Sequence, residues 1–260
     1  MSRDSFIVIA LWFILCAIAI PLWALTVNTE QAVFYTHYYV SFMLIITSAG
    51  AAFFCYRTMM SCDLKDKNRK AWRFLSIGLS FWSVGAVLDA IYPLLHQGAI
   101  TPFPWYADIS FLLLEPFVVM ALFIFRKNLN VSMPLGNWIA TIITFFGALS
   151  FAIWINGTAL QTVEPISLII TITYIILDSI LLAMTVATAS ILAGGLIARP
   201  WWFALAGLFL FYLGNITYTL VRNIDEPLLA GVVLDLTWPI AFGLIAIAAT
   251  TARTIYKAFD

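Results

Sequence analysis

The sequence predicts an all-α, polytopic integral membrane protein whose chain crosses the bilayer eight times. Of its 260 residues, 63% are hydrophobic and 10% are charged, and the mean hydropathy is +0.99. A soluble domain carries about 25% charged residues. Apolar runs long enough to cross the hydrocarbon core, at about 1.5 Å of rise per residue, recur eight times.

The predicted spans follow one another with short connections. The first run begins near the N-terminus and is about twenty residues long, which exceeds the roughly 7–15 residues of a signal-peptide core and predicts an uncleaved span. The connections on the outer side are too short to form a separate domain. The eight predicted spans are 6–25, 38–56, 74–95, 108–125, 138–155, 166–193, 201–220 and 232–251.

The distribution of basic residues predicts the orientation. Twelve of the thirteen Lys and Arg residues fall on one side of the eight-span scheme, and Arg222 alone falls on the other. Cytoplasmic connections of membrane proteins carry the excess of Lys and Arg. We therefore expect a multi-pass protein of the cytoplasmic membrane with both termini in the cytoplasm.

An internal repeat is indicated when the third and fourth spans are laid on the seventh and eighth. Each unit then holds four spans, an even number, so the two copies share one topology and an axis along the membrane normal. This predicts two four-helix halves, residues 1–130 and 131–260; the alternative is chance recurrence in apolar sequence. The matched pairs are Trp72 and Trp201, Gly78 and Gly207, Gly85 and Gly214, Asp89 and Tyr218, and Asp108 and Asp235; the fourth and eighth spans also each carry a proline, Pro116 or Pro239.

Several function classes are disfavoured by composition. The formal net charge is zero and no basic cluster interleaves with aromatic residues, which argues against nucleic-acid binding. The three cysteines form no CxxC pattern, and the two histidines lack the spacing of a metal site. No catalytic triad or phosphate-binding loop is present, so we expect neither an enzyme nor a cofactor.

Two carboxylates lie well inside predicted spans. Glu115 and Asp178 are nearer the middle of the bilayer than any other acidic residue in the scheme. A charged carboxylate there costs at least about 2.5–3.5 kcal/mol on insertion scales, so such groups face protein or water, or are protonated. We expect both to point into the helix bundle, and we favour a functional role over a structural one.

Further polar residues lie closer to the outer boundary. Asp at a helix start is commonly a cap, which we favour for Asp108 and Asp235, whereas Asp89 either reaches the interface or faces a ligand. Together these groups predict an outer-facing cavity suited to a cation, a protonated amine or a ligand with hydrogen-bond donors. The candidate ligand-binding residues are Glu115, Asp178, Asp89, Asn215, Tyr174, Asp108, Asp235, Tyr92 and Tyr218.

The third and fourth spans resemble a known kind of region. The stretches SIGLSFWSVGAVLDAIYPLL and ITPFPWYADISFLLLEPFVVMALFIF are similar to multi-span sensory regions that precede diguanylate cyclase or histidine kinase domains in bacteria and archaea. Residues 207–249 share the pattern less closely. That pattern often has an acidic residue after the second glycine, where this chain has Ala86 and Asn215.

The resemblance implies a receptor that signals through its cytoplasmic C-terminal end. No output domain is present before Asp260, so either a cytoplasmic partner supplies the output or the sequence continues into such a domain. Two rivals remain open. Parallel repeats and mid-membrane acids also suit a proton- or cation-coupled transporter, and the chain would equally suit a structural subunit of a membrane complex.

Overall fold

The computed structural model describes residues 3–27, 29, 34–96, 98–99, 101–157, 160, 164–192, 194–195, 198–221 and 233–259. These residues form long helices, and no strand occurs among them. The helices are α1 (Arg3–Thr26), the π-helical η1 (Phe34–Val40), α2 (Ser41–Met60), α3 (Asn68–Leu95), α4 (Tyr106–Leu129), α5 (Leu135–Asn156), α7 (Pro165–Ala189), α8 (Ala198–Val221) and α9 (Leu234–Phe259).

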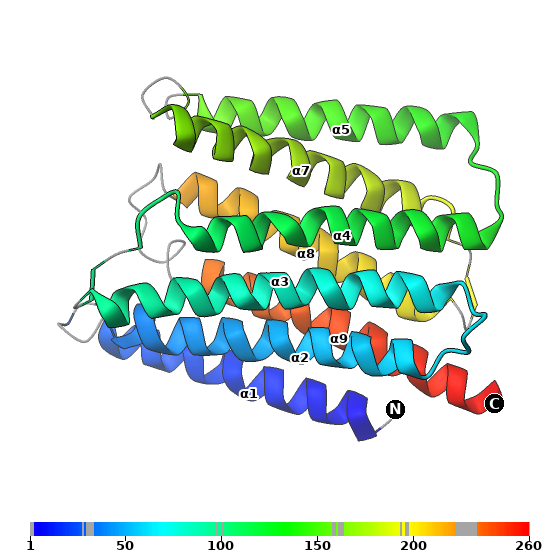
Figure 1. Ribbon diagram of the computed structural model, residues 1–260, viewed down its shortest axis with the longest axis horizontal. Helices are drawn as coiled ribbons and strands as arrows, with labels where there is room; N and C mark the ends of the chain where they lie inside the picture. The colour runs from blue at the N-terminus through cyan, green and yellow to red at the C-terminus, as the bar shows by residue number, and fades with distance from the viewer. Residues whose placement is uncertain are drawn as a thin grey trace.

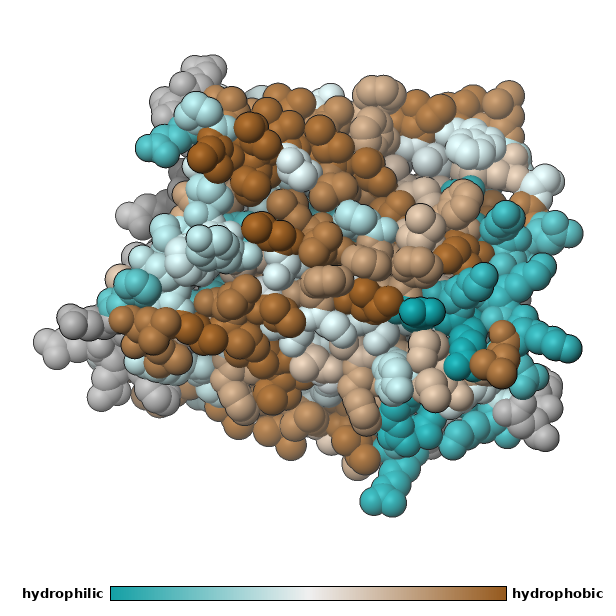
Figure 2. Space-filling view, viewed as in Figure 1, coloured by the Kyte–Doolittle hydropathy of each residue, from teal (hydrophilic) through white to brown (hydrophobic). Residues whose placement is uncertain are grey.

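Within this described part, eight helices are long and apolar enough to cross a membrane. The predictions of an all-α fold and of a multi-pass membrane protein are confirmed at that level. The helices run side by side, and the two chain ends lie at the same end of the bundle (Figure 1). Figure 2 shows hydrophobic side chains along the helices and hydrophilic ones gathered at the end that carries both termini.

The helices extend beyond the predicted spans chiefly at that hydrophilic end. Helix α3 begins at Asn68, six residues before its predicted start, and α9 reaches Phe259, eight residues past its predicted end. Hydropathy marks the hydrocarbon-facing part of a helix, and charged turns that continue it into the interface escape that signal. Arg222, the exception to the charge rule, lies outside the described residues.

Two helix boundaries have a local chemical cause. Pro165 is the first residue of α7, where its missing N–H would have had no helical partner. Asn130 follows the last residue of α4 with φ of 50°, the left-handed conformation that commonly ends a helix and that Asn tolerates.

Six helices form a closed ring in which each packs on the next: α2, α3, α4, α7, α8, α9 and back to α2. Helix α1 packs on the outside of the ring against α9, and α5 packs on the outside against α7. In Figure 1, α1 and α5 accordingly lie at opposite edges of the molecule.

Glycines bring pairs of helices in the ring into close contact. A Cβ added at Gly78 would lie 3.0 Å from the Leu114 carbonyl oxygen, and one added at Gly207 would lie 2.7 Å from that of Ala241. Close backbone approach is the main way in which helices gain packing energy in lipid. The α3–α4 and α8–α9 contacts therefore both depend on residues with no side chain.

The core contains two tryptophans that meet between the halves of the ring. Trp72 and Trp201 are both less than 2% exposed, and their ring centroids lie 5.0 Å apart. Phe125 stacks on Trp201 with centroids 3.6 Å apart. These aromatic contacts join α3, α4 and α8 near the hydrophilic end of the bundle.

Candidate functional site

The candidate site is built around two buried carboxyl groups on neighbouring helices. Glu115 on α4 is 1% exposed and Asp178 on α7 is 8% exposed. The two helices pack directly on each other, and the carboxyl groups lie within hydrogen-bonding reach of one another. The expectation that both point into the bundle agrees with this burial.

The pair is extended by an amide and an indole from the next two helices of the ring. Asn215 on α8 donates from Nδ2 to Asp178 Oδ1 at 2.7 Å. Trp238 on α9 donates from Nε1 to Asn215 Oδ1 at 3.0 Å. The resulting chain of contacts runs from α4 through α7 and α8 to α9.

No cation within the described residues neutralises this pair. The two ion pairs found there both use Asp4, far from Glu115 in the fold. Glu115 Oε2 is buried and has no hydrogen-bond partner in the described part of the chain. Because two unpaired carboxylates cannot both stay charged at such burial, the pair requires a proton or a bound cation.

Asp108 lies in the same α4–α7 interface, towards the end of the bundle opposite the termini, and its carboxylate accepts hydrogen bonds from both helices' sides. Its Oδ2 accepts a hydrogen bond from the Trp105 backbone N–H at 2.7 Å, and its Oδ1 accepts one from the Tyr174 hydroxyl at 3.0 Å. Asp108 therefore satisfies a backbone donor at the start of α4, as predicted, but from the third helical position rather than the N-cap. Tyr174 ties the same carboxylate to α7.

Asp235, at the start of α9, has its own tyrosine neighbour. The hydroxyl of Tyr35 in η1 lies beside the Asp235 carboxyl, without the geometry of a well-formed hydrogen bond. Burial, with the Asp235 charge adding to it, raises the pKa of the Tyr35 hydroxyl, so Tyr35 stays protonated. In both places an acidic residue near a helix start meets a tyrosine from the other predicted half of the chain.

The remaining predicted residues lie elsewhere near the end of the bundle opposite the termini. The Asp89 side chain is partly buried, and its backbone carbonyl accepts a long hydrogen bond of 3.4 Å from Thr101. Tyr92 stacks on His96 with ring centroids 4.0 Å apart. Tyr218 is 45% exposed and lies 6.0 Å from Trp238 between ring centroids. Their assignment to a ligand site stays a prediction.

The carboxyl pair is closed to solvent in this conformation. Two surface grooves, of about 350 and 360 Å³, lie between α2 and α3 and between α1 and α9, and neither is lined by Glu115 or Asp178. No cluster of three metal-ligating side chains occurs among the described residues. A ligand can therefore reach the pair only if the helices around it move.

Tyr35 and Trp238 are the members of this arrangement that sequence reasoning missed. Both are aromatic residues near span ends, where Tyr and Trp are common in any membrane protein. The chain holds ten of each. One sequence feature could have pointed to Trp238: it lies three residues after Asp235, so the two residues share one face of a helix.

No protein-family model matches the chain, and no curated protein or solved structure is significantly similar to it. The geometry of the carboxyl pair and its neighbours is therefore the main guide to function.

Proposed function

We propose that this protein is a receptor-like membrane module that binds a small cationic ligand at Glu115 and Asp178. The observation that carries the proposal is that two carboxyl groups from neighbouring helices are buried together with no described cation beside them. A cation or protonated amine would supply the missing charge and bridge α4 to α7. The resemblance of the third and fourth spans to sensory regions favours a receptor.

A route from this site to the last helix supports signalling. Asp178 is hydrogen-bonded to Asn215, and Asn215 to Trp238 on α9, so movement of α7 is transmitted to the helix whose far end is the chain's C-terminal segment. Ligand binding shifts such an equilibrium only by its differential affinity for the two states. A cation that neutralises the carboxyl pair would bind more tightly to the state in which the two carboxyl groups are close together, and this supplies the difference in affinity.

The proposal includes two related four-helix halves, residues 1–130 and 131–260. It is supported by matching contacts: Gly78 meets Leu114 and Phe117, while Gly207 meets Ala241 and Leu244, each partner being 127 residues later in the chain. The ring order is consistent with this pairing, since α4–α7 and α2–α9 are both contacts between halves. Helices α1 and α5 depart from it, because α1 packs on the other half and α5 on its own.

We also propose that both termini lie on the cytoplasmic side of the cell membrane. The hydrophilic end of the bundle in Figure 2 holds the basic residues of the α2–α3 connection and of the α9 end. Positive residues mark the cytoplasmic side. The carboxylates Asp108 and Asp235 then lie near the outer surface.

A ligand screen by thermal unfolding tests the site. The purified full chain in neutral detergent is titrated with sodium, potassium and a series of primary alkylamines at constant ionic strength. We expect at least one cation to raise the melting temperature saturably. Glu115→Gln and Asp178→Asn should each weaken that apparent affinity by about 10-fold or more, because a hydrogen bond to a charged group contributes about 1.5–3 kcal/mol.

The matched control is Glu164→Gln, which removes an exposed carboxylate at the N-cap of α7 whose side chain makes no capping hydrogen bond. This variant should keep the wild-type response. If no cation gives a saturable shift, or if all three variants respond alike, the carboxyl pair is not the binding site.

Cation-coupled transport is the second candidate, and the polar groups that line the α4–α7 interface from Asp108 to Asp178 favour it. Transport requires the ligand to leave towards the other side of the membrane. Proteoliposomes loaded without the responding cation should show no uptake above protein-free vesicles if the protein is a receptor. Uptake that is lost in Glu115→Gln would instead establish a transporter.

A further inference from the structure

A basic groove lies between the first turn of α1 and the last turns of α9, at the hydrophilic end of the bundle. Its volume is about 360 Å³, and its polar lining consists of Arg3, Asp4, Thr250, Arg253, Thr254 and Lys257. It lies at the far end of the bundle from Asp108 and Asp235, so a ligand bound there would be independent of the proposed cation site.

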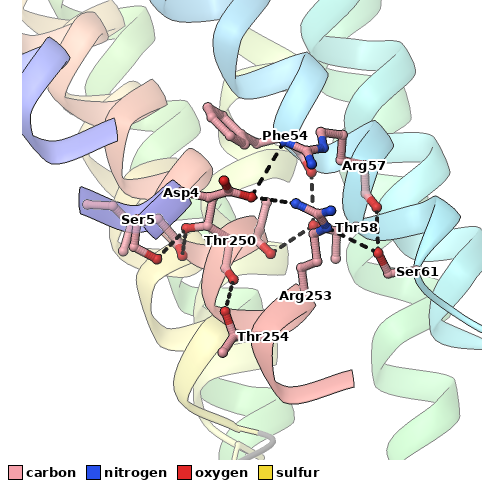
Figure 3. A network of polar contacts seen from close by, with 11 residues as sticks. Asp4, Ser5, Phe54, Arg57, Thr58, Ser61, Thr250, Arg253 and Thr254 are labelled. Atoms are coloured by element: carbon pink, nitrogen blue, oxygen red, sulfur yellow. Dashed lines mark hydrogen bonds and ion pairs between the residues drawn. The ribbon is translucent and has the colours of Figure 1, made fainter. Parts of the chain in front are cut away.

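The polar network beside this groove joins three helices (Figure 3). The Asp4 carboxylate on α1 accepts a short contact from Arg253 on α9 and lies 3.5 Å from the Arg57 guanidinium on α2. Arg253 also donates from Nε to Ser61 Oγ at 3.2 Å. These contacts orient the guanidinium of Arg253, whose side chain is 15% exposed.

The groove has more positive charge than its own carboxylate balances. Arg3, Arg253 and Lys257 line it, with Asp4 as the one acid in the lining, and Asp4 is shared with Arg57. Neither Arg3 nor Lys257 forms an ion pair within the described part of the chain. Three cations that converge on one concave site suit an anion with several acceptor oxygens.

The position of the groove suits a phosphate group at the membrane surface. Phe6 and Ile7, one turn along α1 from Arg3, are 61% and 45% exposed and would lie against lipid chains. Basic pockets at the cytoplasmic ends of membrane helices are where anionic headgroups bind. We propose that this groove binds a phosphate group, either that of an anionic lipid headgroup or free phosphate, between α1 and α9.

Asp4 gives the proposal a distinctive consequence. Its carboxylate repels an incoming phosphate while it holds Arg57 and Arg253 together. Asp4→Asn should therefore lower the melting temperature of the protein without ligand and, at the same time, tighten phosphate binding. A purely structural ion pair would produce only the first effect.

The test measures thermal unfolding of the full chain in neutral detergent. The probes are phosphatidylglycerol, phosphatidylcholine with the same short acyl chains, and inorganic phosphate at matched ionic strength. We expect phosphatidylglycerol to raise the melting temperature saturably and phosphatidylcholine to have no such effect. A parallel response to inorganic phosphate would assign recognition to the phosphate group itself, whereas its absence would assign it to the lipid headgroup.

Charge-matched double variants provide the control. Arg3→Gln with Lys257→Gln removes two groove cations, while Lys65→Gln with Lys127→Gln removes two exposed cations elsewhere at the same end. The first pair should weaken the apparent affinity for phosphatidylglycerol by about 10- to 30-fold, at about 1 kcal/mol per basic residue. Equal losses in both pairs, or equal stabilisation by phosphatidylcholine, would overturn the proposal.

Discussion

Asn215 connects the buried carboxyl group of Asp178 to the partly buried indole of Trp238. Its amide nitrogen donates to Asp178 and its amide oxygen accepts from Trp238. An Asn inside an apolar helix costs free energy unless both ends of its amide are satisfied. At this position both ends are satisfied by residues on different helices, so Asn215 orients the site.

The variant Asn215→Leu should destabilise the protein by about 1–3 kcal/mol, because it leaves the Trp238 indole N–H and one oxygen of Asp178 unpaired. Chemical unfolding in mixed detergent, followed by tryptophan fluorescence, measures this change. The control is Asn156→Leu, whose side chain, among the described residues, bonds to the Ala152 carbonyl of its own helix. Similar losses in the two variants would show that the network contributes nothing specific.

The sequence predicts the role of some site residues but not of others. Glu115 stands out because an acid in the middle of an apolar run has few structural explanations, and Asp178 stands out for the same reason. The contact between them is a tertiary fact that no spacing along the chain contains. Tyr35 gave no signal, because its role depends on Asp235, which lies 200 residues away along the chain.

At the scale of helices, some glycines lie where two helices pack closely, whereas others lie on an open helix surface. Gly207 faces the Ala241 backbone, whereas Gly147 in α5 has nothing within 4 Å of the place where a Cβ would stand. Both are interior helix positions, where Ala is otherwise favoured over Gly by roughly 0.5–1 kcal/mol. The two positions therefore form a matched pair.

We expect Gly207→Ala to destabilise the protein by about 1–3 kcal/mol through overpacking, since a backbone oxygen cannot move aside as a flexible side chain does. Gly147→Ala should instead be neutral or stabilising. Melting temperatures of the two variants in the same detergent provide the comparison. An equal effect of both substitutions would mean that α8 and α9 do not approach each other as closely as described.

Helix number and helix ends were predictable to different degrees. The hydrocarbon-length runs mark all eight spans, because the bilayer imposes a minimum length on each. The charged turns 68–73 of α3 and 252–259 of α9 were missed, since they are helical through continuity with the span rather than through hydropathy. Hydropathy misses these turns because their residues are charged, as is usual at the membrane–water interface, and not because the residues are poor helix formers.

For the whole molecule, the order of helices in the ring was the unpredictable part. Sequence pattern suggests four-span halves, but it does not say that α4 lies against α7 or α2 against α9. In a membrane protein, the surface of a helix that faces lipid is about as apolar as the surface that faces another helix. Hydropathy therefore cannot identify which helices are neighbours. Only the matched glycines of the α3–α4 and α8–α9 pairs indicated where helices meet.

If the protein signals through α9, the charge state of the Glu115–Asp178 pair must affect the far end of that helix. The double variant Glu115→Gln with Asp178→Asn removes any negative charge that the pair can carry and so imitates neutralisation by a bound cation. Backbone hydrogen exchange in the full chain reports the local opening of each helix. Glu164→Gln is again the matched control.

The measurement that tests this coupling most directly is hydrogen exchange of residues 250–259 in the double variant. We expect slower exchange around α4 and α7, where the uncompensated negative charge is removed, together with altered exchange in 250–259, and no change in Glu164→Gln. Altered exchange confined to α4 and α7, with residues 250–259 the same as in the wild type, would contradict a receptor that signals through α9.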